Sequence, residues 1–226
     1  MGKFTKLVAN GITQTDRRKR NMKYYQYNKY PIEFVLSENI DKHFDFHNHV
    51  RHYIISMVMQ GTVEVYLKNR KLDCSGGDVF IVPPYAMHSV RQGQDVRLLS
   101  MCVGTAFIEE MDFETIERIV GDLLRDMVKQ GIIGKEQREK LLFSVRMLYS
   151  RQAESRKEMD LDIKTLIDKM TSQPEQDLPI EALAAEIFTS KYYLIRKFKK
   201  SIGMTPHQFC IQNRIRKSQR LSGRSI

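Results

Sequence analysis

The sequence predicts an α+β protein in which a small β-barrel comes first, a helical segment follows, and an all-α helix-turn-helix unit ends the chain. Two observations predict this order. The hydrophobic pattern changes from the alternation typical of strands to helical spacing near residue 107, and a polar linker separates a strongly basic C-terminal stretch from the rest. With 226 residues, 42% of them hydrophobic, the chain is long enough for one large or two modest domains.

Composition excludes several classes of protein. No stretch approaches 18 consecutive apolar residues and the N-terminus lacks the apolar region of a signal peptide, so we expect a cytoplasmic protein with no membrane contact. The three cysteines, Cys74, Cys102 and Cys210, show no CxxC spacing, which argues against a disulfide framework and a thiolate metal site.

Charge is unevenly distributed along the chain. Residues 1–30, predicted as a basic N-terminal arm, carry eight Lys or Arg against one acid and include the run Arg17 to Arg20. The last 37 residues hold ten Lys or Arg and no acid. Such a surface fits nucleic-acid phosphates, while an anionic membrane or a merely solvated basic face remain the alternatives.

Strand signals fill residues 31–106. Residues 62–68 alternate apolar and polar side chains, His52 to Met59 is a nearly continuous apolar run, and residues 78–82 form a short apolar run after two glycines. Gln60-Gly61 and residues 68–70 stand where hairpin turns are needed. The pattern predicts a small barrel or sandwich.

Helical spacing follows in residues 107–170, where apolar residues recur every three to four positions in three stretches. These apolar faces exceed what a small barrel needs to cover, so we expect the segment to pair two protomers. A charge at Leu123 or Leu124 should then give monomers. Residues 171–177 are polar and predict a linker.

The C-terminal unit, residues 178–226, predicts two short helices joined by a tight turn. Ser190 is placed to cap the second helix, which runs from Lys191 to about Ile202, and Gly203 ends it. A basic second helix that carries an aromatic residue can enter a major groove. A helical hairpin that docks on a protein is the alternative.

This C-terminal stretch strongly resembles the first half of the DNA-binding domain of AraC/XylS-type bacterial transcription regulators. The resemblance covers about 45 residues, and its markers are Ser190, Tyr193, Leu194, Phe198, Lys199, Lys200, the string Gly203 to Pro206, and the helix Arg214 to Leu221. The family's domain has a second helix-turn-helix, which would begin where this sequence stops. The resemblance therefore implies an incomplete DNA-binding domain.

The resemblance also implies which side chains meet DNA. The outward residues Tyr192, Ile195 and Arg196 would touch base edges, with Arg196 placed for bidentate contact with guanine. The predicted DNA-binding residues are Ser190, Lys191, Tyr192, Ile195, Arg196, Lys197, Lys199 and Lys200.

Histidines cluster in the β region. His47-Asn48-His49 puts two imidazoles on one face of a strand, and His88 follows the stretch Gly77 to Met87. This resembles the two-part motif of the cupin barrel, whose histidines bind a divalent metal together with a Glu. No Glu stands at positions 53 and 54, and Tyr85 replaces a usual glycine. The resemblance implies a metal-free sensor, so we expect His47, His49, Tyr53 and His88 to bind an effector, with no catalytic residue and no cofactor.

The sequence thus predicts an effector-responsive, sequence-specific DNA-binding transcription regulator with a cupin-like effector domain. We expect it to control genes of sugar or other small-metabolite use, to form a homodimer, and to contact RNA polymerase if it is an activator. A metal-dependent cupin enzyme, such as a sugar isomerase or dioxygenase, is the alternative. A structural dimerisation protein is the third hypothesis.

Overall fold

The computed structural model divides into two compact units, residues 1–153 and residues 154–226. It describes residues 4–8, 12–17, 21–27, 29–49, 51–67, 70–158 and 161–221. Part of the predicted basic run, residues 18–20, lies outside the described residues, as do positions 68 and 69 of the second predicted hairpin turn.

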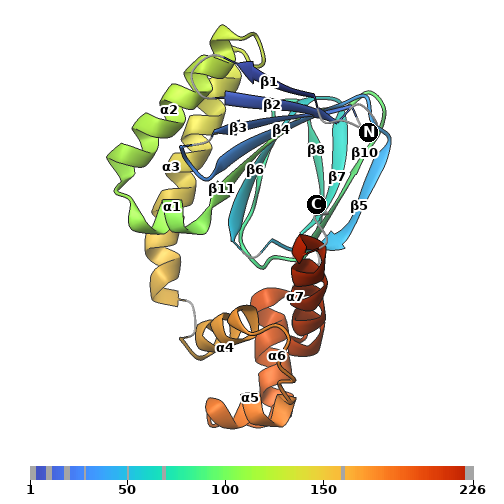
Figure 1. Cartoon of the computed structure of the whole chain (residues 1–226), viewed down its shortest axis with the longest axis vertical. Helices are drawn as coiled ribbons and strands as arrows, with labels where there is room; N and C mark the ends of the chain where they lie inside the picture. The colour runs from blue at the N-terminus through green and yellow to red at the C-terminus, as the bar shows by residue number, and fades with distance from the viewer. Residues whose placement is uncertain are drawn as a thin grey trace. The chain divides into compact units, whose positions relative to one another are not determined.

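Two antiparallel sheets make up the strand region of the first unit (Figure 1). The seven-stranded sheet has, in spatial order, β1 (Phe4–Val8), β2 (Ile12–Arg17), β3 (Met22–Tyr27), β4 (Ile32–Glu38), β11 (Arg97–Gly104), β6 (His52–Gln60) and β9 (Val79–Val82). The four-stranded sheet has β5 (Lys42–His47), β10 (His88–Gln92), β7 (Thr62–Leu67) and β8 (Arg70–Ser75).

The position of β6 in the sheet explains why its sequence is almost continuously apolar. It pairs with β11 on one side and β9 on the other, so it lies inside the sheet, and both of its faces are covered. Ile55 and Met57 are buried on one face and Val58 on the other. Gly61 then turns the chain into β7 with a left-handed backbone, φ +80°.

Each face of the seven-stranded sheet has its own core. Between the two sheets lie small and branched residues from both, namely Val58, Val63, Val65, Cys74, Phe80, Val82, Ala86, Val90, Val96 and Leu98. The other face carries Phe34, Leu36, Ile55, Met57, Leu99, Met101 and Val103, which pack in one cluster with the helices.

Three helices cover that second face: α1 (Thr105–Glu110), α2 (Phe113–Lys129) and α3 (Lys135–Glu158). Asp112 caps α2, because its carboxylate accepts the backbone N–H of Thr115 at 2.8 Å. Leu123 and Leu124 are both buried in the core that α2 shares with the sheet. The expectation that a charge at either position would only separate protomers is wrong, because these side chains hold the fold.

An ion-pair network joins β3, β4 and β11 of the larger sheet and reaches the loop between α2 and α3. The Glu38 carboxylate at the end of β4 accepts hydrogen bonds from Lys23 of β3 at 2.8 Å and from Arg97 of β11 at 2.7 Å. The Arg97 guanidinium also donates to the carbonyl of Ile132, between α2 and α3, at 3.1 Å. The network therefore connects the ends of three central strands of the larger sheet to the loop between α2 and α3.

The second unit contains α4 (Leu161–Ser172), α5 (Ile180–Glu186), α6 (Lys191–Ile202) and α7 (Pro206–Leu221). The Ser190 hydroxyl accepts the N–H of Tyr193 at 3.3 Å, and Gly203 ends α6 with φ +89°. Leu194, Phe198 and Ile202 are the buried face of α6. The predicted second helix, Lys191 to Ile202, is present with its caps at Ser190 and Gly203, and the helix before it spans Ile180–Glu186.

The α+β fold class is confirmed. Strands β1, β2 and β3 lie in residues 1–30, which the sequence analysis had treated as an arm outside the barrel. The predicted domain boundaries otherwise stay a prediction. In the part of the chain that the structure describes, no helix is both long enough and apolar enough to span a membrane.

The turn at Gly61 gives a direct test of the fold. A Cβ there would lie 2.9 Å from the carbonyl oxygen of Asp95, in addition to the strain of a positive φ. We expect Gly61→Ala to lower the free energy of unfolding by about 1–3 kcal/mol in urea titrations. Gly93→Ala is the matched control, because its Cβ would meet nothing within 4 Å, and its effect should stay within about 0.5 kcal/mol. Equal losses in the two variants would contradict this account of the turn.

Candidate functional site

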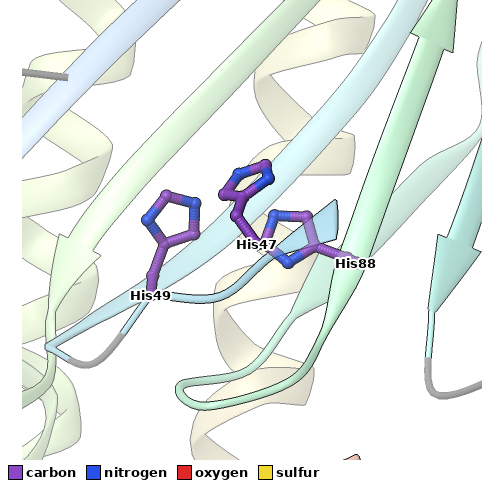
Figure 2. A group of neighbouring side chains, drawn as sticks. All are labelled: His47, His49 and His88. Carbon is purple, nitrogen blue, oxygen red and sulfur yellow. The ribbon is translucent and has the colours of Figure 1, made fainter. Parts of the chain in front are cut away.

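Three imidazoles meet where β5 and β10, two neighbouring strands of the smaller sheet, lie side by side (Figure 2). His47 ends β5 and pairs in register with His88, which begins β10, while His49 follows two residues after β5. The ring centroids are 4.2 Å apart for His47 and His88, 5.0 Å for His47 and His49, and 5.1 Å for His49 and His88. His88 is 3% exposed, and the other two rings are half-buried. The predicted convergence of the three histidines is present in the structure.

Backbone carbonyls set the tautomer of two of these rings. Nδ1 of His47 lies 2.6 Å from the carbonyl oxygen of Asp45, and Nδ1 of His88 lies 2.9 Å from that of Ala86. A carbonyl oxygen can only accept, so each Nδ1 must carry the hydrogen. In the neutral rings Nε2 therefore presents a lone pair, and His47 and His88 act as acceptors toward a ligand.

The loop before β10 is held against the histidine segment. The N–H of Tyr85 donates to the carbonyl of His49 at 2.6 Å, and the side-chain amide of Asn48, 1% exposed, donates to the carbonyl of Tyr85 at 3.4 Å. Tyr85 adopts φ +66°, so the chain bends here as it would at the glycine that Tyr85 replaces. Residues 48 and 85 thus fix the spacing between the two histidine-bearing segments.

The cluster has the donor set of a metal site. One nitrogen from each ring lies within 4.8 Å of the others, and no carboxylate or thiolate joins this group among the residues described. Three imidazoles can hold Zn²⁺ with a fourth position left open, and a ring that donates its other nitrogen to a carbonyl is a common arrangement at such sites.

Tyr53, the fourth predicted effector residue, lies on β6 of the larger sheet, and its role in binding stays a prediction. It pairs with Val103 and packs against the core shared with the helices, on the other face of β6 from Ser56. Ser56 faces the space between the sheets, where its hydroxyl lies 2.8 Å from that of Ser100. The sequence analysis missed this pair, and the only signal for it was two serines within otherwise apolar strands.

A carboxylate and a thiol belong to the same face of the larger sheet. Glu33 pairs with Cys102 across β4 and β11, and the Glu33 carboxylate accepts a hydrogen bond from the side-chain amide of Gln26 at 2.8 Å. Burial raises the pKa of the Cys102 thiol to about 12, and the charge of Glu33 adds to the effect. Cys102 is therefore an uncharged, unreactive thiol at neutral pH.

The second candidate site is the exposed face of α6. Tyr192 is 70% exposed, and Arg196, Lys199 and Lys200 are exposed as well, whereas Ile195 is half-buried. The hydroxyl of Ser190 is engaged in the helix cap. Tyr192, Arg196, Lys199 and Lys200 therefore lie on the side of α6 opposite its buried positions, whereas Ile195, also predicted to point outward, does so only in part.

Two of the predicted phosphate contacts are engaged in ion pairs within the unit. Lys191 pairs with Glu181 of α5 at 3.1 Å, and Lys197 pairs with Asp162 of α4 at 3.4 Å. Lys199 and Lys200, in the last turn of α6, therefore have the more accessible charges. Whether any of these residues contacts DNA stays a prediction.

Two basic residues of α7, Arg214 and Lys217, contact the predicted linker. The guanidinium of Arg214 donates to the carbonyls of Pro174 and Gln176, both at 2.9 Å, and Lys217 pairs with Glu175. The sequence analysis had counted these bases only as part of a positive tail. Their charge is partly matched by acids of the linker, which lowers the share of the tail that can meet phosphates.

The chain matches two known family models, and the matched residues include both candidate sites. A family model described as the AraC-like ligand binding domain matches residues 30–188, which include all three histidines. A second model, for bacterial regulatory helix-turn-helix proteins of the AraC family, matches residues 170–209, which include α5 and α6. No curated protein matches the chain.

Solved structures that are similar to the chain include proteins described as cupins. KdgF from Halomonas sp. is 24% identical, with a TM-score of 0.29 over 44% of this chain and 84% of that one. An RmlC-like cupin from Shewanella frigidimarina is 18% identical, with a TM-score of 0.32 over 46% and 85%. The Cnp3 cupin domain of Schizosaccharomyces pombe is 17% identical, with a TM-score of 0.34 over 42% and 76%.

Proposed function

The chain belongs to the AraC family of bacterial transcription regulators, and on this premise we propose that the histidine cluster binds the small molecule to which the regulator responds. The two matched models describe an effector-responsive protein that binds DNA through a helix-turn-helix. The observation that carries the proposal is the meeting of His47, His49 and His88 in the matched ligand-binding region. The regulator then acts in the cytoplasm, where bacterial DNA is.

The tautomers of His47 and His88 indicate the chemistry of the effector. Both rings present a lone pair at Nε2, so they favour a ligand that offers hydrogen-bond donors. A hydroxyl-rich molecule such as a sugar fits this requirement, and the Ser56 and Ser100 hydroxyls add polar groups between the same two sheets. An effector held only through carboxylate or phosphate oxygens would face lone pairs instead of donors at these two rings.

A metal-dependent cupin enzyme is the second candidate, and the three converging nitrogens favour it. His47, His49 and His88 would hold the ion, which would supply Lewis-acid activation of a bound ligand. The match of residues 170–209 to a DNA-binding family supports a regulator over an enzyme. We therefore propose that the chain is not an enzyme.

Response to the effector is proposed to be a shift in population. Bound effector favours one arrangement of the chain over another, and the size of the shift equals the difference in its affinity for the two. An activator of this kind would also contact RNA polymerase.

The effector site can be tested with metal-free protein and a panel of neutral sugars and polyols. We expect at least one panel member to raise the thermal midpoint of the wild-type chain. His47→Ala and His88→Ala should each weaken its binding about tenfold or more, because a hydrogen bond in a buried site is lost. His43→Ala is the matched control, since that ring is exposed and outside the cluster, and it should bind as wild type does. Stabilisation by Zn²⁺ alone, resistant to chelator and lost in the same two variants, would favour the enzyme.

We also propose that two copies of the chain pair through α3. Phe143 is 59% exposed and Met147, four residues on, lies on the same face of the helix. Arg146 on the adjoining surface pairs with Glu117 of α2, which holds the two helices together beside this patch. An apolar patch flanked by polar residues is the usual character of an interface.

Sedimentation equilibrium tests the pairing. Phe143→Asp should convert a dimer to folded monomers, because it places a charge in the apolar patch. Arg118→Asp, which also introduces a carboxylate but at an exposed position of α2 away from Phe143, should leave the dimer intact. Leu124→Asp should unfold the chain. Folded Phe143→Asp protein that remains dimeric would place the interface elsewhere.

Binding measurements can distinguish the contacts of α6 with base edges from its contacts with phosphates. They use duplexes that the wild-type chain selects from a random pool. Arg196→Ala should lose about 1–3 kcal/mol of discrimination at one base position. Lys199→Ala or Lys200→Ala should weaken all sequences alike and lower the salt slope by about one. Lys164→Ala serves as the control, because Lys164 is an exposed lysine of α4 outside the predicted DNA contacts. An Arg196→Ala variant with unchanged sequence preference would refute its role as a base reader.

A further inference from the structure

The turn between α5 and α6 holds an aromatic residue in an unfavourable position. Phe188 has φ +51° and its side chain is 98% exposed, more than any other large apolar residue that the structure describes. Its N–H donates to the carbonyl of Ala185 at 3.0 Å, and the next N–H, of Thr189, donates to the carbonyl of Ala184 at 2.9 Å. The turn is therefore fixed by two backbone hydrogen bonds, and Phe188 cannot leave the left-handed region without breaking them.

Folding alone does not explain a phenylalanine here. The left-handed region favours glycine or asparagine, because a Cβ and a bulky ring crowd the backbone there. The same unit uses Gly203 for the left-handed residue that ends α6. At position 188 the chain instead keeps a strained backbone and an apolar ring in water, neither of which adds stability. Strained residues of this kind gather where a protein binds its ligand.

The position of Phe188 relative to α6 indicates the ligand. It lies two residues before Ser190, the cap of α6, and the first turn of that helix carries the exposed ring of Tyr192. In a helix-turn-helix, this end of the second helix is the end that contacts base edges. The exposed side of the same helix is basic, through Arg196 in its middle and Lys199 and Lys200 in its last turn, and this charge complements DNA better than it does an apolar protein surface.

We propose that Phe188 is a DNA-contacting residue whose ring packs on the apolar groups at the edge of the major groove, such as a thymine methyl. The proposal rests on DNA binding by the α5–α6 unit and adds to it a residue outside α6. The ring adds apolar contact to the charged contacts of the helix, and the fixed turn holds it in place before DNA arrives.

Three variants test the contact, again with duplexes selected from a random pool by the wild-type chain. Phe188→Gly and Phe188→Asn should raise the urea midpoint, because both residues tolerate the left-handed backbone. Both should bind the selected duplex about fivefold more weakly, or worse, with an unchanged salt slope, since no charge is removed. Leu161→Ala is the control, because Leu161 is an exposed apolar residue of the same unit on α4, and it should bind as wild type does.

The outcomes are distinct. Weaker binding by a more stable Phe188→Gly protein supports the contact, since loss of fold cannot explain it. Equal binding by wild type and both Phe188 variants overturns the proposal and leaves DNA binding intact, and the ring then serves a protein partner. A wild-type chain that selects no duplex overturns both the contact and the proposed function.

Discussion

The central strands of the larger sheet each contribute to two interiors at once, and the rest of the first unit depends on that constraint. On β6, Ile55 and Met57 pack with the helices while Ser56 and Val58 face the smaller sheet, and on β11 Leu99 and Met101 alternate in the same way with Leu98 and Ser100. A slip of one residue in either strand would bring serines into the helical core and large apolar side chains into the space between the two sheets. The fixed register therefore sets both the stability of the fold and the polarity of the space between the sheets.

The same alternation explains what the sequence could reveal. The convergence of His47, His49 and His88 was predictable from the spacing of the three histidines and the turn before the third, although His49 follows the end of β5 and does not lie on the strand. The placement of Tyr53 was not predictable, because it lies in an apolar run whose two faces look alike in the sequence. The burial of Leu123 and Leu124 was not predictable for a related reason, since the sequence does not show that β4, β6 and β11 present large apolar side chains on the face that α2 covers. By contrast α6 was predictable to its ends, because its caps and spacing are local.

Backbone strain has a common pattern in the two units. Of the residues that the structure describes, four other than glycine have a positive φ: Asn21, Asn39, Tyr85 and Phe188. Asparagine tolerates this conformation, so the two turn asparagines need no special explanation. The two aromatic residues do not tolerate it well, and one lies beside the histidines while the other lies beside the helix matched to a DNA-binding family. Of these four residues, the two whose side chains are unfavourable for a positive φ therefore both lie at candidate sites.

The network around Glu38 has a consequence for acid stability. Burial opposes ionisation of this carboxyl, but the hydrogen bonds and charges of Lys23 and Arg97 outweigh it and lower the pKa of Glu38 below its usual range. A group whose pKa is lowered by folding adds stability above its unfolded pKa, and that contribution disappears as the pH falls through the folded value. Protonation would then leave Arg97 without its carboxylate partner while it still donates to the carbonyl of Ile132. Acidification should therefore loosen the junction between these strand ends and the α2–α3 loop, whereas the apolar contacts of the two cores do not depend on the charge of Glu38.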